Sequence, residues 1–436
     1  MLSPMLNQRE KLLGLVPFAL GVLGSGAALV LTYIRGFEST HYPDAPLFIN
    51  QAESILRGWN YMTLHPLVFE APLGFPALIS STFLINGGTS LALFKIFLSL
   101  CHGVSTFLVA SIGIRMGLPR LFWILAALFF SLDPFMLSAA TDIQVEPLVT
   151  LIVLFWAYLF LLPSENSKRF ILQIICFPIS GFIAITFRPN ILIPFLLLSI
   201  LMFRSWFTNH LSRSLMLTSV AIFFSLLTAY EVFLSRLYGG FVFLAANGGL
   251  NTVLTCRDQF LSQYLGFIST KQNSQINHSY YAYLQNLRED LIARQPNISF
   301  SQLNHEYLST GLATCLENPI KSSYVLIVKS IALWRPYTVF GAYGTKVALI
   351  SLFIWLPLTF ATVWYLTRSN LTMPNRILRN YFLILSIGFT ISLIPSSTQI
   401  RHRVAFVEPF YWLFAAYMLG ILFSHWRKSR SLKILT

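Results

Sequence analysis

The sequence predicts an all-α polytopic membrane protein with about ten transmembrane helices and further short helices on the outer face. Two observations predict this fold class. Of the 436 residues, 55% are hydrophobic and only 11% are charged, whereas soluble domains carry about 25% charged residues. The apolar residues also fall in long runs, with short basic clusters between them. The chain therefore has too little polar surface to face water on all sides.

A transmembrane helix needs about 20 apolar residues, or about 17 at the short end. Runs near this length lie at residues 12–34, 90–114, 121–141, 147–163, 170–187, 191–206, 214–235, 346–366, 380–396 and 406–424. The first run is too long for the apolar part of a cleavable signal peptide, so we expect it to remain as the first span. The run Gly74–Ile85 has only about 12 residues. We expect it to form a re-entrant or interfacial helix on the outer face, introduced by Pro72 and Pro76.

The basic residues predict the orientation. Every second connection is basic and almost free of acid: Arg9/Lys11, Arg115/Arg120, Lys168/Arg169, Arg204/Arg213, Arg368/Arg376/Arg379 and Arg427/Lys428/Arg430/Lys433. By the positive-inside rule these connections and both termini are cytoplasmic, and the acidic connections lie outside. The same clusters account for the net charge of +14, so we expect no nucleic-acid partner. The predicted location is the cell (inner) membrane, with multiple passes.

Three parts of the chain follow from this topology. Residues 1–235 form an N-terminal transmembrane module that includes the first outer loop, 35–89. Residues 236–346 form an extracytoplasmic loop region with helical sequence such as Tyr280–Ala293, and residues 347–436 form the C-terminal transmembrane helices. Within the loop region, Pro319–Leu333 is typical of an amphipathic helix lying on the membrane surface. Cys256 and Cys315 also lie there, and they can form a disulfide if the loop is extracytoplasmic.

Asp44 is the first candidate for chemistry. It follows His41, Tyr42 and Pro43 and precedes a helical pattern from Leu47 to Gly58. One interpretation is a helix N-cap, in which the carboxylate accepts hydrogen bonds from the first turn. The other is a general base held at the membrane surface by the same helix start.

Four segments resemble a known enzyme family. They are Pro43-Asp44 … Phe48 … Ala52 … Leu56-Arg57-Gly58 … Tyr61 … Glu70-Ala71-Pro72-Leu73-Gly74-Phe75-Pro76-Ala77-Leu78, then Asp142 to Glu146-Pro147, then Gly181 to Arg188-Pro189, and finally Arg401-His402-Arg403 … Pro409. In order and position they resemble the polyprenyl-phosphate-sugar-dependent GT-C glycosyltransferases, which include glycosyltransferase family 39, the protein O-mannosyltransferases and the aminoarabinose transferases. The resemblance covers most of the first 200 residues and the last 40.

The resemblance implies a GT-C-like fold and an inverting sugar transfer on the extracytoplasmic side. The catalytic Asp of the family falls on Asp44. Many members have a second acid beside it, whereas Ala45 follows here. The implied partners are a polyprenyl-phosphate-linked sugar and membrane lipids, with a protein, lipid or glycan as the acceptor.

Arginines on the predicted outer side are candidates for binding the donor phosphate, because a guanidinium matches the geometry of phosphate oxygens. They are Arg188, Arg335, Arg401 and Arg403. The alternative for Arg188 and for the 401–403 cluster is contact with lipid headgroups.

A wider group of residues is placed near the substrate or a possible metal ion: His41, Tyr42, Glu53, Tyr61, His65, Glu70, Asp142, Glu146 and His402. The acids can pair with the arginines or hold a divalent cation, which is the one cofactor we consider. The alternative for each acid is an ordinary solvated loop charge, and the histidines have no metal-binding spacing.

Two other functions stay open. A secondary transporter needs ionisable groups near mid-membrane and broken helices in matched halves. A polysaccharide polymerase or ligase would place its chemistry in the second outer loop, which is the extracytoplasmic loop region 236–346. Asp44 would then be dispensable.

Overall fold

The computed structural model describes residues 3–42, 44–58, 72–162, 167–207, 212–244, 248–253, 255–257, 269–335, 345–393 and 405–435. Within these ranges every regular element is a helix. The helices of the N-terminal part are α1 (Ser3–Arg35), α2 (Ala45–Leu56), α3 (Gly74–Asn86), α4 (Ala92–Arg115), α5 (Arg120–Ser131), α6 (Pro134–Ala140), α7 (Glu146–Phe160), α8 (Ser167–Phe187), the 3₁₀ turn η2 (Pro189–Ile191), α9 (Leu192–Phe207) and α10 (Ser212–Leu237). The remaining helices are α11 (Gly248–Val253), α13 (Thr270–Arg294), α14 (Phe300–Glu317), α15 (Pro319–Leu333), α17 (Thr345–Thr367), α18 (Met373–Leu393) and α20 (Glu408–Leu435).

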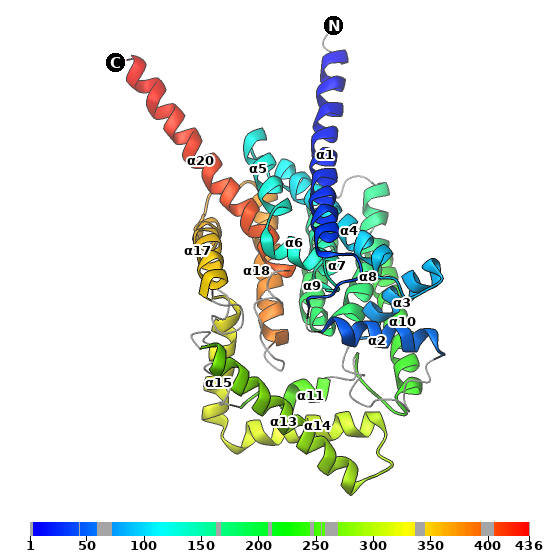
Figure 1. The fold of residues 1–436 in the computed structure, drawn as a ribbon. Helices are drawn as coiled ribbons and strands as arrows, with labels where there is room; N and C mark the ends of the chain where they lie inside the picture. The colour runs from blue at the N-terminus through cyan, green and yellow to red at the C-terminus, as the bar shows by residue number, and fades with distance from the viewer. Residues whose placement is uncertain are drawn as a thin grey trace.

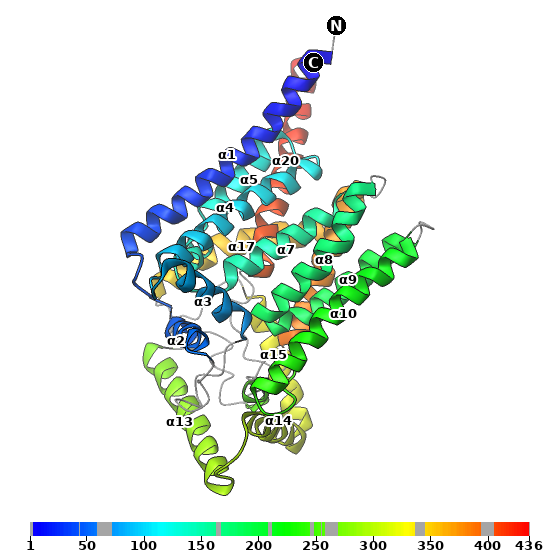
Figure 2. The same cartoon turned by 90° about the vertical axis from the view of Figure 1, so that its right-hand side faces the viewer.

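The long helices form a bundle with both chain termini at one end (Figure 1). At the opposite end, α2 lies across the bundle, and α11, α13 and α14 lie beyond it (Figures 1 and 2). We call this second end the outer end, following the side that the charge pattern predicts.

Helices occupy all ten apolar runs identified in the sequence. Five of the described helical segments are long and apolar enough to cross a membrane: Gly14–Arg35, Ala92–Arg115, Met216–Leu237, Thr345–Thr367 and Met373–Leu393. Large apolar side chains point away from the bundle on several of them, and Phe353 on α17 is 79% exposed. Such surfaces suit contact with lipid. The chain is thus an all-α protein with the helices of a membrane protein, and the count of ten spans stays a prediction.

The run 121–141 differs from the expected continuous span. It forms two helices, α5 and α6, bent by 52° at their junction. Pro134 has no N–H to continue the first helix. Asp133 starts the second by accepting hydrogen bonds from Phe135 N (2.9 Å) and Met136 N (3.1 Å). Trp412 Nε1 donates to the other carboxylate oxygen at 3.2 Å, so this buried acid has partners on both oxygens.

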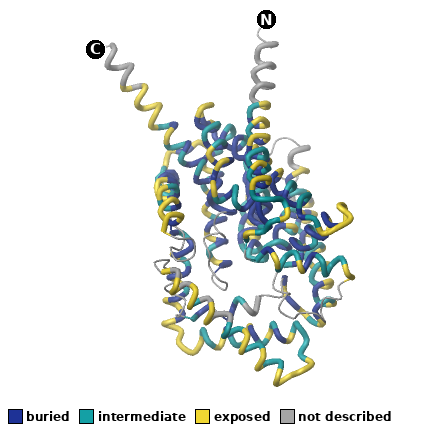
Figure 3. Tube along the Cα trace, in the orientation of Figure 1, coloured by how far each residue is buried: buried dark blue, intermediate teal, exposed yellow. Residues whose placement is uncertain are grey.

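The centre of the bundle is closely packed, and Figure 3 shows its buried residues concentrated where α4, α6 and α7 meet. α1 packs on α4 through small residues. A Cβ atom added to Gly103 would lie 2.5 Å from the carbonyl oxygen of Gly21 and closer still to the hydroxyl of Ser25. Small residues let helix backbones approach closely, which is typical of helix pairs in membranes.

The short helix α3 confirms that the run after Pro72 is helical. It has 13 residues, and a helix of this length is about 20 Å long, shorter than the apolar core of a bilayer. Its first turns are buried, with Phe75 in edge contact with Phe48 of α2, while Leu84 and Ile85 are 70% and 76% exposed. α3 therefore anchors α2 on the outer end of the bundle. Whether it enters a membrane stays a prediction.

The second outer region has its own small apolar core, formed by Val253, Leu303, Tyr307, Val328 and Ala332. A disulfide joins Cys256 to Cys315, with the two Cα atoms 5.2 Å apart. The pairing considered from the sequence is therefore present. The predicted helix around Tyr280–Ala293 is also confirmed, as part of α13.

α15 has the bounds that the sequence predicted. Val325 and Leu333 are buried on one side, and Trp334, directly after the helix, donates a hydrogen bond from Nε1 to Thr390 Oγ1 at 3.1 Å. The opposite side exposes Ile320, Ile327 and Ile331. The exposed side is thus apolar, and its contact with a membrane surface stays a prediction.

Candidate functional site

Arg188 is positioned by the end of α8. Pro189 disfavours helical backbone in the residue before it, so α8 ends at Phe187 and Arg188 is extended, with φ of −152°. Its Nη2 lies 2.8 Å from Glu146 Oε1, and the two side chains are only 12% and 2% exposed. Glu146 lies in the first turn of α7, where the helix dipole favours a carboxylate.

Two polar atoms of this ion pair have no partner within the described part of the chain. Arg188 Nη1 and Glu146 Oε2 are both buried, and neither has a hydrogen-bond partner among the residues that the structure describes. The side-chain oxygen of Asn190, two residues after Arg188, is also buried and has no hydrogen-bond partner among the described residues. Buried polar groups in folded proteins are nearly always hydrogen-bonded. A ligand with anionic and hydroxyl oxygens would satisfy these groups, because the guanidinium donates and the carboxylate accepts.

Asp142 holds the first outer loop against the bundle. Its Oδ2 accepts the backbone N–H of His41 at 2.9 Å, and its Oδ1 accepts the N–H of Ile143 at 2.8 Å. Asp142 lies four residues before Glu146 in the chain. The loop that carries Asp44 is therefore fixed to the segment that carries the Glu146–Arg188 pair.

Two cations in the same area were not among the sequence candidates. Lys95, in the first turn of α4, is fully buried, and its Nζ donates to the carbonyl oxygens of Gly36 (3.1 Å) and Ser39. It also interacts electrostatically with Asp142. Arg35, at the end of α1, donates to Thr141 Oγ1 at 2.8 Å. A charge inside a predicted span is the signal that could have identified Lys95.

Glu38 completes the attachment of this loop. It accepts hydrogen bonds from Ser90 Oγ (2.6 Å) and from the backbone N–H of Leu91 (2.9 Å). Burial raises the pKa of Glu38, but these hydrogen bonds outweigh it and hold the pKa below its ordinary value.

Asp44 occupies the position before α2, as predicted, but its side chain makes no capping hydrogen bond to the helix. Instead, Tyr42 donates a hydrogen bond from its hydroxyl to Asp44 Oδ2 at 2.9 Å. The N-cap interpretation therefore holds for the position and not for the carboxylate. Tyr42 orients the carboxylate beside the loop that Asp142 fixes.

Glu53 lies apart from this cluster. It pairs with Arg57 on the same helix at 3.4 Å, and the two side chains are 31% and 72% exposed. This is the solvated charge that the alternative interpretation described. Arg335 is buried at the end of α15, next to the contact between Trp334 and α18.

Several candidates lie outside the described residues: Tyr61, His65, Glu70, Arg401, His402 and Arg403. Among the residues that are described, no three His, Cys, Asp or Glu side chains gather as they would around a metal ion. The divalent cation therefore stays a prediction.

Six of the described candidates form one set, and the other two, Glu53 and Arg335, are not part of it. At the outer end of the bundle, hydrogen bonds join His41 to Asp142 and Tyr42 to Asp44, and an ion pair joins Arg188 to Glu146, which lies four residues after Asp142. Arg35, Glu38 and Lys95 contact the same loops. We call this set the outer polar cluster. Searches against protein-family models and curated protein sequences find no match for the chain.

Proposed function

We propose that the protein is a membrane glycosyltransferase that moves a monosaccharide from a polyprenyl-phosphate donor to an acceptor on the extracytoplasmic side, with inversion. The observation that carries the proposal is the buried Arg188–Glu146 pair, in which Arg188 Nη1 has no hydrogen-bond partner among the described residues. Asp142, four residues before Glu146, holds the loop that carries Asp44. The sequence resemblance to GT-C glycosyltransferases supports the same assignment.

In this reaction the acceptor hydroxyl oxygen attacks the anomeric carbon of the sugar. Asp44 takes the hydroxyl proton as the new C–O bond forms. The bond from the anomeric carbon to the phosphate oxygen breaks, and its electron pair leaves with the polyprenyl phosphate. Arg188 Nη1 donates to that phosphate as its negative charge increases. Arg401 and Arg403 are further candidates for the same role.

Among the acids of the cluster, Asp44 suits the role of base best. Asp142 accepts backbone N–H groups on both oxygens, and Glu146 is committed to Arg188. Asp44 is at the start of α2 without serving as its cap, and the hydroxyl of Tyr42 holds its orientation. The disulfide in the second outer region supports an oxidising compartment for this end of the molecule.

The broken helix α5–α6 favours a second candidate, a secondary transporter. Discontinuous helices with buried ionisable residues form the binding sites of many transporters. Here Asp133 at the break has its hydrogen bonds satisfied by the protein itself, which weakens that candidate.

The test is a transfer assay in membranes that contain the protein, with a panel of radiolabelled polyprenyl-phosphate sugars. We expect wild-type protein to consume one of them. Asp44→Asn should lower the rate by about 10²–10⁴-fold, because that is the usual contribution of a general base. Glu53→Gln is the matched control, since it removes an outer-end carboxylate outside the cluster, and we expect near-normal transfer.

Near-normal transfer by Asp44→Asn would contradict the assignment of the base and favour a polymerase or ligase with its chemistry in the second outer loop. Accumulation of a solute in vesicles, without hydrolysis or transfer of any sugar in the panel, would favour the transporter.

A further inference from the structure

A second site lies on α10, outside the outer polar cluster. Its central residue is Glu231, which is the single acid in the candidate span Met216–Leu237. The carboxylate oxygen Oε1 accepts the backbone N–H of Leu244 at 2.9 Å. The other oxygen, Oε2, is buried and has no hydrogen-bond partner among the residues that the structure describes. A carboxylate in a membrane segment is costly unless it is paired, and such residues commonly mark binding sites.

The backbone around Glu231 is strained. Gly239 and Gly240 have positive φ angles and reverse the chain after α10, so that residues 241–244 return along the helix. Leu244 then has φ of 61°, and it is the one non-glycine residue with positive φ in the described part of the chain. Left-handed backbone in a bulky residue persists only where the surroundings enforce it, and it is concentrated at ligand sites. Here the Leu244 N–H donates to Glu231 and so fixes the direction of the carboxylate.

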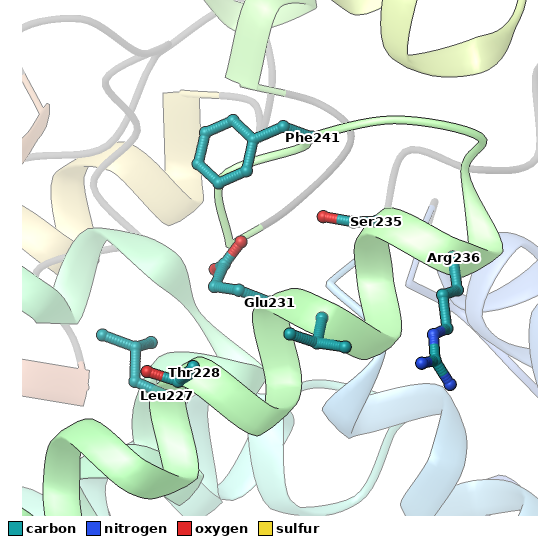
Figure 4. A pocket seen from close by; sticks show the side chains of 7 residues that line it. Leu227, Thr228, Glu231, Ser235, Arg236 and Phe241 are labelled. Atoms are coloured by element: carbon teal, nitrogen blue, oxygen red, sulfur yellow. The ribbon is translucent and has the colours of Figure 1, made fainter.

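Glu231 and Phe241 line an open surface cavity of about 480 Å³, a volume within the range of small-ligand sites. Figure 4 shows the Glu231 carboxylate rising from α10 toward the returning segment, with the ring of Phe241 above it. Thr228 and Ser235, one turn before and after Glu231, contribute hydroxyl groups, and Leu227 and Val232 contribute apolar walls. Arg236 lines the same cavity.

We propose that this cavity binds the headgroup of a membrane lipid that carries a primary ammonium group, with Glu231 as the main acceptor. An ammonium compensates the charge of the carboxylate, which a neutral hydroxyl cannot do. Its three N–H donors can serve Oε2, which has no partner among the described residues, and the hydroxyls of Thr228 and Ser235. A divalent metal ion fits less well, because it requires more oxygen ligands than one carboxylate and two hydroxyls provide.

The surroundings fit a lipid better than a soluble amine. α10 is a candidate span, and its surface exposes Phe224 (53%) and Phe233 (43%), where acyl chains can pack. This proposal does not depend on the glycosyltransferase activity.

The test is binding of short-chain phospholipids to the detergent-purified protein, followed by native mass spectrometry. We expect phosphatidylethanolamine to bind about tenfold more tightly than phosphatidylcholine, because a quaternary ammonium has no N–H to donate. Glu231→Gln should abolish this difference, and the exposed Glu317→Gln, which removes the same charge elsewhere, should preserve it. Phe241→Ala should weaken binding of both lipids and keep the difference.

Equal affinity for the two lipids in the wild-type protein, or an unchanged difference in Glu231→Gln, would overturn the proposal. If Glu231→Gln does not fold, the wild-type comparison and Phe241→Ala still decide it. Tighter binding of phosphatidylglycerol than of phosphatidylethanolamine would overturn the choice of an ammonium. Glycerophosphoethanolamine, which has the headgroup without acyl chains, should bind about tenfold more weakly than the lipid; equal binding would overturn the choice of a lipid.

Discussion

Two of the acid–arginine pairs at the outer end of the molecule, Arg188–Glu146 and Arg57–Glu53, differ in almost every physical respect. Arg188 follows α8 and Glu146 begins α7; their side chains meet at 2.8 Å and are 12% and 2% exposed. Arg57 and Glu53 are four residues apart on one helix, meet at 3.4 Å and are 72% and 31% exposed. Burial removes solvent screening from the first pair and leaves the second in water. The first pair can therefore hold a ligand in place, and the second serves only the surface of α2.

Removing one partner of the buried pair should have the largest effect. We expect Glu146→Ala to lower the free energy of unfolding by about 3–5 kcal/mol, because Arg188 is left buried without a counter-charge. Thermal unfolding in detergent measures this, followed by reaction of the buried Cys101 thiol with a fluorogenic maleimide. The double variant Glu146→Leu/Arg188→Met removes both charges and should be more stable than the single one. A single variant as stable as wild type would show that water already reaches Arg188.

Lys329 on α15 is a buried cation outside the candidate spans, and like Arg188 it is shielded from solvent. It is 1% exposed, and the carbonyl oxygen of Thr255 accepts a hydrogen bond from its Nζ at 3.4 Å. Burial lowers the pKa of Lys329 from its ordinary value to about 7. The unfolded chain therefore binds more protons above pH 7, and stability should rise with pH from about 7 toward the ordinary lysine value near 10.4.

Lys329→Met removes this titration while keeping an unbranched side chain. We expect the variant to unfold at a higher temperature than wild type at pH 7 and the difference to shrink by pH 9. Lys321→Met, an exposed substitution on the same helix, is the control. A difference that does not change with pH would contradict the assignment of the titration to Lys329.

Arg188→Lys tests whether phosphate binding depends on the forked donors of the guanidinium or on positive charge alone. Lysine keeps the positive charge but loses the forked donors, so Nζ can pair with Glu146 or with a phosphate, and not with both as the guanidinium does. We expect polyprenyl-phosphate binding to weaken by about 1.5–3 kcal/mol, the usual contribution of a hydrogen bond to a charged group. Titration with the labelled lipid phosphate measures it. Unchanged affinity would remove Arg188 from the phosphate site.

The exposed pair should give the smallest effect. Glu53→Ala and Arg57→Ala should each change the free energy of unfolding by less than about 0.5 kcal/mol, because exposed helix pairs of this spacing contribute about 0.3–0.5 kcal/mol. Any effect should vanish at high salt. A loss comparable to that of Glu146→Ala would show that exposure is a poor guide to the role of these pairs.

Much of the helix arrangement was predictable, because apolar length and basic clusters report directly on helices that contact lipid. The break at Asp133 was less visible, since it depends on a proline and a local cap inside one apolar run. The starts of α13 and α14 were predictable from the sequence, because Ser269/Gln272 and Ser299/Gln302 have the spacing of capping boxes and form them in the structure.

The sequence indicated which residues belong to the candidate site, but it did not indicate which of them interact with one another. Asp142, Glu146 and Arg188 were expected on the outer side, but the sequence does not say that Glu146 pairs with Arg188 while Asp142 binds backbone N–H groups. Those partners depend on how α7 and α8 pack. Lys95 and Glu231 were missed because each is a single charge in a long apolar run, and its role depends on the loop that folds back over it.

The most direct measurement is a structure of the protein with polyprenyl phosphate bound. We predict phosphate density within about 3 Å of Arg188 Nη1, beside the loop that carries Asp44. The lipid tail should run along the apolar surface of the bundle. Phosphate density away from Arg188, with the Arg188–Glu146 pair unchanged, would contradict the role of Arg188 in binding the donor.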